Sequence, residues 1–431
     1  MKKVVITGIG AVTPLSDNFP DSWSLVKKGV SGIDRITKFD VLGSPWKMAG
    51  EVKKFTPELY LSKKVILRLD PFVQYAVASA IMAAENAGLV KQRSEVRSQK
   101  SAPPQPPLTK GGIRGGVIIG SSRGGITTIE KELQKLYGSR FTVHGSRISP
   151  YLMPSTTISM AASYAAQKLG IKGHCLGISN ACASGTNAIG EAYRLIRHGY
   201  ADIIIAGGAE APVCRLCVEG YGISGALSKT DNPSASKPFD RKRDGFVIAE
   251  GACVLVLEGY ESALKRNATI YAEIIGYSNT TDAFHITRPD IEGEVIAIRT
   301  ALEDAGISPT DVDYINAHGT STPIGDKTEA EAIKRVFKNS VSRIPAKIPV
   351  TSIKSMTGHM LAASGAFETA CTAVSIKEGI IPPTINVTEK DPECDINIVT
   401  EKRNADIRIA ITNSFGFGGV NAVIVLKKIM E

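Results

Sequence analysis

The stretch "ISNACASGTNAIGEA", residues 178–192, indicates how this chain of 431 residues is built. It places Cys182 among small residues, at the start of a helical pattern that Gly199 closes. A second stretch, "LAASGAFETACTAVSIKEG" at 361–379, repeats the "ASG" at 363–365, and its closing glycine follows after the same 14 positions. Ala362 stands where the first copy has the cysteine.

A further pair of matches supports duplication. "AENAGL" at 84–89 reappears as "LEDAGI" at 302–307, and each copy precedes a strand that ends in a turn of small residues. Because the matches keep the same order, a duplicated core explains them better than chance does. We expect an N-terminal half, residues 1–257, that carries Cys182, and a C-terminal half, residues 258–431.

The repeat also reveals an insertion. The next strand follows the helix-closing glycine after 8 residues in the second half but after 29 in the first. The extra residues, about 91–112, are rich in Pro, Gly and charge, which predicts a surface loop.

Apolar strand-like runs alternate with helical patterns along the whole chain. "GVIIGSS" (116–122), "ADIIIAGG" (201–208) and "ACVLVLEG" (252–259) read as buried strands, whereas 71–89 and 293–307 read as helices. This alternation predicts an α/β fold with largely buried sheets.

Composition narrows the class of protein. The seven cysteines are scattered and odd in number, which favours free thiols in a reducing cytoplasm. Cys214 and Cys217 form a lone C-x-x-C that is interpreted as packing, since no second pair completes a zinc site. The net charge of +9 is largely local to 91–116, so we expect no nucleic-acid partner. No apolar run is long enough for a membrane helix, and the early glycines of "MKKVVITGIGAVTP" argue against an export signal.

Cys182 is a candidate nucleophile. A thiol at a helix N-terminus faces unpaired N–H groups and the positive end of the dipole, which favour the thiolate form. Small neighbours leave room for a substrate and let backbone N–H groups approach an oxyanion. A buried packing cysteine is the alternative for this residue taken alone.

Two histidines lie in loops rich in Gly, Ser and Thr: His318 in "NAHGTSTPIGDKTE" (316–329) and His359 in "SIKSMTGHMLAASGAFE" (352–368). A Cys/His/Asn hydrolase needs one histidine and leaves the second, and Lys354, unexplained. An acyltransferase that forms carbon–carbon bonds uses both, because two neutral imidazoles can donate N–H to an enolate oxygen while a lysine keeps them uncharged.

These motifs, with "NSFGFGGVN" (413–421) and in this order, closely resemble the β-ketoacyl-[acyl carrier protein] synthases, and among them the type II elongating enzymes. The similarity runs from "VVITGIGAVTPL" (4–15) to "NAVIVLKK" (421–428), apart from the insertion. The resemblance implies a thiolase fold with duplicated halves in five layers, αβαβα, and a homodimer. It also implies decarboxylative condensation of an acyl group on Cys182 with malonyl-acyl carrier protein, in fatty acid elongation.

The resemblance implies roles for single residues as well. His318 and His359 would hold the malonyl thioester, and Lys354 and Glu368 would form the polar network around His359. The N–H groups of Cys182 and Phe417 would make the oxyanion hole, with Phe417 as a gate. Three threonines would line the pantetheine tunnel, which brings the carrier's own prosthetic group: Thr287, Thr320 and Thr322. No resident cofactor or metal is expected, except that Glu368 is a candidate ligand of a monovalent cation.

Alternatives remain open for several of these residues. Lys354 and Glu368 form a structural ion pair on one interpretation, and Thr320 and Thr322 cap a turn on another. The basic cluster Lys63, Lys64 and Arg68 is either solvated surface charge or the docking site for an acidic carrier protein.

The chain departs from the family pattern at three positions. Arg123, in "IGSSRGG" (119–125), stands where an apolar residue usually lines the acyl pocket, so we expect a shorter or more polar pocket. Ala362 and Ser364 replace the commoner glycine and alanine after His359.

Three other functions share features with this chain. A thiolase needs a second catalytic cysteine, which "NSFGFGGVN" lacks, and a non-catalytic partner subunit lacks the nucleophile that is present here. A synthase of a specialised lipid or polyketide pathway has the same chemistry and stays open as the alternative.

Overall fold

The computed structural model describes residues 1–91, 114–138, 148–338 and 348–429. The described part of the chain holds a hydrogen-bonded run of 11 strands in the order β12-β10-β9-β14-β15-β8-β1-β7-β6-β4-β5. The predicted insertion at 91–112 lies outside the described residues, except for Lys91.

The bounds of the elements follow the chain. The strands of this run are β1 (Val4–Val12), β4 (Gly115–Gly120), β5 (His174–Ile178), β6 (Ile203–Glu210), β7 (Gly251–Gly259), β8 (Ala272–Thr281), β9 (Tyr314–Asn316), β10 (Pro349–Thr351), β12 (Asn397–Ile398), β14 (Ile409–Gly416) and β15 (Val420–Lys427). Short strands form two small sheets, β2 (Asp34–Arg35) with β3 (Met48–Ala49) and β11 (Ile380–Ile381) with β13 (Arg403–Asn404).

The helices are α1 (Phe19–Lys27), α2 (Lys63–Ile66), α3 (Pro71–Asn86), α5 (Ile126–Gly138), α6 (Leu152–Thr156), α7 (Met160–Leu169), α8 (Ser184–Arg197), α9 (Arg215–Ile223), α10 (Tyr260–Lys265), α11 (Ile291–Ala305), α12 (Pro323–Phe337), α13 (Lys354–Thr357) and α14 (Ala362–Glu378). Single 3₁₀ turns are η1 (Pro57–Leu59), η2 (Ala181–Ala183) and η3 (Pro309–Asp311).

The strand order repeats, as the sequence predicts. The first half reads β5-β4-β6-β7-β1 and the second β10-β9-β14-β15-β8. In each half the first two pairings are parallel and the last two antiparallel. Three residue pairs, from Val4↔Ile274 to Ile6↔Ala272, join β1 to β8 and so link the halves.

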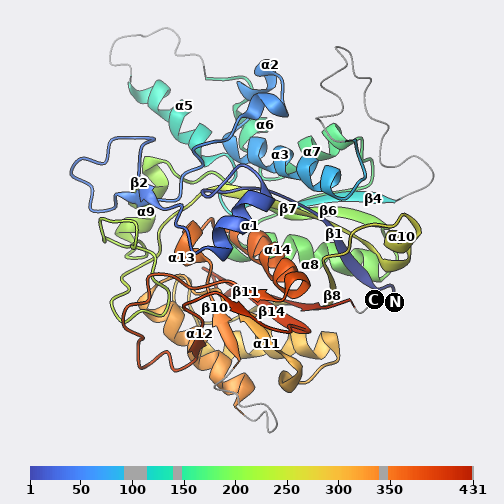
Figure 1. Ribbon diagram of the computed structural model, residues 1–431. Coiled ribbons are helices and arrows are strands. Elements are labelled where there is room, and N and C mark those ends of the chain that lie inside the picture. The colour runs from blue at the N-terminus through green and yellow to red at the C-terminus, as the bar shows by residue number, and fades with distance from the viewer. Residues whose placement is uncertain (92–113, 139–147, 339–347, 430–431) are drawn as a thin grey trace.

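Five layers follow from this arrangement (Figure 1). Helices α3 and α7 cover the outer face of the first-half strands, and α11 and α12 cover that of the second half. Helices α8 and α14 lie between the two sets of strands, within the largest hydrophobic cluster. The predicted duplicated αβαβα fold is confirmed.

Glycines in β1 permit close packing of the layers. The strand continues through Gly8 and Gly10 to Val12, well beyond the first apolar residues of the chain. A Cβ on Gly8 would lie 2.3 Å from the Ala83 carbonyl oxygen, and one on Gly10 2.2 Å from that of Ser79. These glycines therefore let α3 lie against the strand.

The two central helices approach each other where the "ASG" repeats lie. A Cβ on Gly185 would lie 2.1 Å from the carbonyl oxygen of Ala362, and one on Gly365 2.0 Å from Thr186 Oγ1. The small residues of both copies are thus required by helix contact at the middle of the molecule. Contact between α8 and α14 brings Cys182 and His359 to one place.

The boundary expected at 257/258 falls within β7 and stays a prediction. No helix in the described ranges combines the length and apolar character needed to cross a membrane.

Candidate active site

Cys182 lies in η2, directly before α8. Ala181 precedes it with φ of +45°, and Leu361 precedes Ala362, the equivalent residue of the second half, with φ of +47°. A positive φ is costly for residues with a Cβ and is found where function or packing imposes it. The repeat therefore conserves a strained turn at the start of both central helices, and only the first copy carries a thiol.

Both predicted histidines meet Cys182. His359 Nε2 lies 3.0 Å from Cys182 Sγ, and the rings of His318 and His359 are 5.3 Å apart and nearly perpendicular. The ligand-capable atoms of these three residues all lie within 4.8 Å of one another. Residues separated by 177 positions thus form one compact cluster.

Burial determines the protonation of Cys182. It raises the pKa of the thiol to about 12, and the nearby charges of Lys354 and Arg123 only partly oppose it. The thiolate that the helix N-terminus was expected to favour is therefore not the resting form, because the pKa of the buried thiol is raised rather than lowered. The thiol must therefore lose its proton in the course of any attack by its sulfur.

The histidines are neutral. Burial lowers the pKa of both imidazoles well below the ordinary value, and the charge of Lys354 lowers it further. A neutral imidazole has one N–H donor and one acceptor nitrogen, so each ring can donate to an oxygen without carrying charge.

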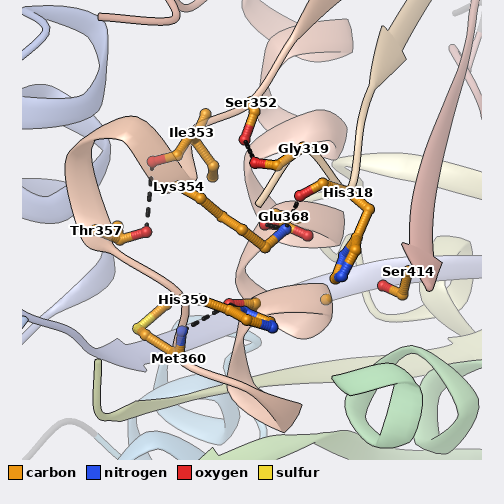
Figure 2. Close-up of polar contacts among 12 residues, drawn as sticks. His318, Gly319, Ser352, Ile353, Lys354, Thr357, His359, Met360, Glu368 and Ser414 are labelled. Carbon is orange, nitrogen blue, oxygen red and sulfur yellow. Dashed lines mark hydrogen bonds and ion pairs between the residues drawn. The ribbon is translucent and has the colours of Figure 1, made fainter. Parts of the chain in front are cut away.

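Lys354 lies between Glu368 and the loop that carries His318 (Figure 2). Its ammonium forms an ion pair with Glu368 and donates to the His318 carbonyl oxygen at 2.6 Å. Lys354 and Glu368 are both buried, so the pair is isolated from water. Burial raises the pKa of Glu368, whereas Lys354 lowers it. This network fixes the loop that carries His318 relative to α14.

Glu329, which the sequence interpretation did not single out, anchors the same loop. Its carboxylate accepts from the backbone N–H groups of His318 and Gly319 at 2.8 and 2.7 Å and from Asn413 Nδ2 at 3.0 Å. It is buried on α12, and a buried carboxylate with three donors is a positioning group. Its place at the end of "NAHGTSTPIGDKTE" was the available signal.

The cluster opens into a cavity of about 340 Å³. Thr287, Thr320 and Thr322 line it, and Thr320 and Thr322 join their hydroxyls at 3.0 Å. Phe417 lines it as well, and its backbone N–H lowers the pKa of the Cys182 thiol slightly against the larger effect of burial. The expected tunnel and gate residues therefore surround the nucleophile, together with Tyr221 and Phe246, which the sequence interpretation missed.

Arg123 does not line this cavity. Its Nε donates to the Tyr221 hydroxyl at 2.8 Å, and its guanidinium lies 5.2 Å from the centre of the Tyr221 ring. Tyr221 forms the cavity wall, so the cation lies directly behind that wall. Among the described residues, no carboxylate oxygen lies within 4 Å of the Arg123 guanidinium.

The basic cluster lies apart from the cavity lining. Lys63 and Lys64 begin α2 and are exposed, whereas Arg68 is half-buried and stacks on Tyr151 at 4.2 Å. Arg68 thus has a packing role, and the two lysines are free to meet a partner.

Cys214 and Cys217 are buried in the hydrophobic cluster beside the cavity. Within the described ranges, the residues found in a metal-type cluster of three or more are Cys182, His318 and His359. The interpretation of the C-x-x-C as packing agrees with this burial.

Comparison with known proteins identifies the family. Residues 1–263 match the β-ketoacyl synthase N-terminal domain, and residues 271–388 match the C-terminal domain. The chain belongs to the β-ketoacyl synthase family. It is 43% identical to 3-oxoacyl-[acyl-carrier-protein] synthase 2 of Staphylococcus aureus (strain COL), over 99% of this chain and 98% of that protein. It is 44% identical to the protein of that name from Coxiella burnetii, over 100% and 99% of the two chains.

Solved structures agree with the family. The type II polyketide ketosynthase AntDE, solved in complex with its acyl carrier protein AntF, matches with a TM-score of 0.87 and 34% identity, over 99% of this chain and 100% of that one. A β-ketoacyl synthase from Burkholderia phymatum matches with a TM-score of 0.87 and 32% identity, over 100% of both chains.

Proposed function

We propose that this β-ketoacyl synthase condenses an acyl group carried on Cys182 with malonyl-acyl carrier protein in fatty acid elongation, releasing CO₂ and a 3-oxoacyl product. One observation carries the proposal: a thiol and two neutral imidazoles converge within 4.8 Å in the lining of one cavity. The relatives at 43–44% identity, named 3-oxoacyl-[acyl-carrier-protein] synthase 2, support it.

The first step is acyl transfer. The Cys182 sulfur attacks the carbonyl carbon of the acyl thioester as the thiol gives up its proton, which is returned to the departing carrier sulfur. The oxyanion is stabilised by two backbone N–H groups: that of Cys182, at the start of the helical segment, where N–H groups have no partner within the helix, and that of Phe417, in the turn between β14 and β15. The bond to the carrier's sulfur then breaks, and the proton leaves with that sulfur.

Decarboxylation and condensation follow. The bond between the malonyl carboxylate and the α-carbon breaks, and its electron pair forms an enolate whose oxygen accepts N–H from His318 and His359. The enolate carbon attacks the acyl thioester on Cys182. Collapse of the intermediate in the same oxyanion hole releases the cysteine sulfur as a thiolate, which takes a proton from the solvent; this is the one proton that the overall reaction consumes.

Intact-mass spectrometry tests the proposal. The wild type, given acyl-carrier substrate, should gain the acyl mass and then lose it when malonyl-carrier is added. Cys182→Ala should gain none, whereas Cys217→Ala, which removes a buried cysteine next to the site, should still be acylated. Acylation of Cys182→Ala would contradict the proposal.

An acyl carrier protein is the proposed partner, and Lys63 and Lys64 are its proposed contacts. Their exposure on α2 and the acidity of carrier proteins support this. Lys64→Glu should raise the KM for carrier-bound substrate at low salt, with kcat unchanged. The control is Lys402→Glu, an equal change of charge at an exposed lysine between β12 and β13. Equal KM values for the two variants would refute this contact.

We further propose a homodimer through β5. This strand is the edge of the strand run, and four of its residues are exposed, including Leu176 at 47%. An exposed apolar edge strand is a ready pairing surface. Sedimentation should give a dimer that Leu176→Lys dissociates, whereas the change at the equally apolar, 89% exposed Leu42 should not. A monomeric wild type would refute the proposal.

A monovalent cation fits beside the Lys354–Glu368 pair. Glu368 Oε2 of that pair lacks a hydrogen-bond partner among the described residues, as do the buried Asn316 Oδ1 and Asn413 Oδ1 on the neighbouring strands β9 and β14. Oxygen donors of this kind suit a hard cation, which would supply charge compensation and rigidity. Exchange of KCl for choline chloride should lower the Tm of the wild type but not that of Glu368→Gln.

Condensation of oxygen-bearing chains in a polyketide or specialised lipid pathway is the second candidate. The guanidinium of Arg123, which lies behind Tyr221 and has no carboxylate partner in the described ranges, favours it, since a hydrocarbon chain gains nothing from a guanidinium. A ladder of acyl carriers should therefore show short or oxygenated chains preferred by the wild type and longer alkyl chains accepted by Arg123→Ile. An ordinary long-chain preference that Arg123→Ile leaves unaltered would refute it. We place either enzyme in the cytoplasm, in keeping with seven free cysteines.

A further inference from the structure

Ser364 contacts the catalytic histidine, although serine at this position departs from the family pattern. Its hydroxyl lies 3.2 Å from His359 Nδ1 and accepts from the Met360 backbone N–H at 2.9 Å. Ser364 and His359 are both 2% exposed, so water does not complete their hydrogen bonds. Ser364 is therefore the polar side chain that meets the inner nitrogen of this imidazole.

The donors at this position can be counted. A hydroxyl has one hydrogen to donate and two lone pairs, of which the Met360 N–H uses one. Among the described residues, His359 Nδ1 is the one remaining partner of the hydroxyl. If Nδ1 carried the hydrogen, the Ser364 hydrogen would be left buried without an acceptor, an arrangement that proteins avoid.

We infer that Ser364 is a positioning residue that donates to His359 Nδ1 and so holds His359 as the tautomer protonated on Nε2. That tautomer directs an N–H at Cys182 Sγ, 3.0 Å away, and at the oxygen of a thioester bound in the cavity. The ring is kept in place by Phe246, edge-on at 5.2 Å. The inference rests on the proposed function only for its kinetic consequence.

His318 offers a contrast. Its Nδ1 is buried and has no partner among the described residues, so no side chain selects its tautomer in the way that Ser364 does for His359. The tautomer preference of His359 is accordingly set by the first turn of α14, which carries Ser364.

Nitrogen NMR of the full-length wild type, with ¹⁵N-labelled histidine, tests the tautomer directly. The chain has six histidines, and His359→Gln identifies the signal of interest. We expect Nε2 protonated and Nδ1 bare in the wild type, and a mixture in Ser364→Ala. A wild-type His359 protonated on Nδ1 overturns the inference, and this measurement requires no activity.

Release of CO₂ from malonyl-carrier protein tests the consequence. Ser364→Ala should slow it about tenfold, the effect of one hydrogen bond, at an unchanged KM. Ser364→Thr, which keeps the hydroxyl, should restore most of the rate. The control is Ser375→Ala, a fully buried serine of the same helix whose hydroxyl has no partner in the described region.

The outcomes separate the two proposals. An unchanged rate and tautomer in Ser364→Ala refute the role of Ser364. A wild type that releases no CO₂ but has Nε2 protonated refutes the proposed function and supports the inference. If Ser364→Ala does not fold, the wild-type spectrum and Ser364→Thr decide.

Discussion

Removal of Lys354 from its buried ion pair gives the most specific test of the site. The side chains of Lys354 and Glu368 are no more than 2% exposed in the folded chain. Lys354→Met therefore leaves the carboxylate of Glu368 buried without its cation. Breaking one side of such a pair costs about 3–5 kcal/mol. A chain of 431 residues unfolds with an entropy of roughly 900 cal/mol/K, so this loss lowers the Tm by about 3–6 °C.

The double variant Lys354→Met/Glu368→Leu separates charge from packing. It removes both charges and keeps similar volume, so we expect its Tm within about 2 °C of the wild type. Both variants should release CO₂ from malonyl-carrier more slowly, because the His318 carbonyl loses its donor. Calorimetry in choline chloride measures the Tm in the absence of K⁺ or another small cation that could bind beside the Glu368 carboxylate and compensate its charge.

Lys402→Met, at an exposed lysine, is the matched control and should leave the Tm unchanged. The reasoning is refuted if Lys354→Met melts like the wild type. It is refuted as well if the double variant loses as much stability as Lys354→Met and Glu368→Leu do when their separate losses are added, because the two side chains would then show no coupling energy.

Three further predictions concern packing and pH. Gly185→Ala should cost about 3 kcal/mol because its Cβ meets Ala362, whereas Gly220→Ala, on open helix surface, should gain about 0.5–1 kcal/mol; equal melting of the two variants would contradict this. Burial raises the pKa of Glu210 to about 7, so the neutral form stabilises the fold below pH 4.5 and this contribution is lost as pH rises through 7. Between pH 4.5 and 8, the Tm of Glu210→Gln should therefore rise by about 3 °C relative to the Tm of the wild type. A Tm difference that stays constant with pH would refute the raised pKa of Glu210. Alkylation of Cys182 by iodoacetamide should accelerate up to pH 10 without a plateau, since its pKa is about 12; a rate that levels off at about pH 9.5 would indicate an ordinary thiol.

The predictability of the site depended on where each residue's partner lies in the chain. Cys182, His318 and His359 stand in short motifs of small residues, and their roles need only those motifs. Ser364 was visible as a departure from the family pattern, but its contact with His359 depends on the turn that begins α14. Glu329 ends a motif that the sequence shows, but its bonds to the backbone N–H groups of His318 and Gly319, 11 and 10 positions away, depend on how α12 packs against that loop.

The sequence by itself determined the duplicated architecture, because hydrophobic patterning and helix-closing glycines are local and repeat in order. It also determined which side chains carry the chemistry. Only the tertiary structure decided their protonation states and which other side chains they contact. Burial, which depends on every layer around the site, keeps Cys182 a thiol and the histidines neutral, against the expectation from the helix N-terminus alone. It also set Arg123 behind Tyr221, since the direction of a side chain follows from packing between distant segments.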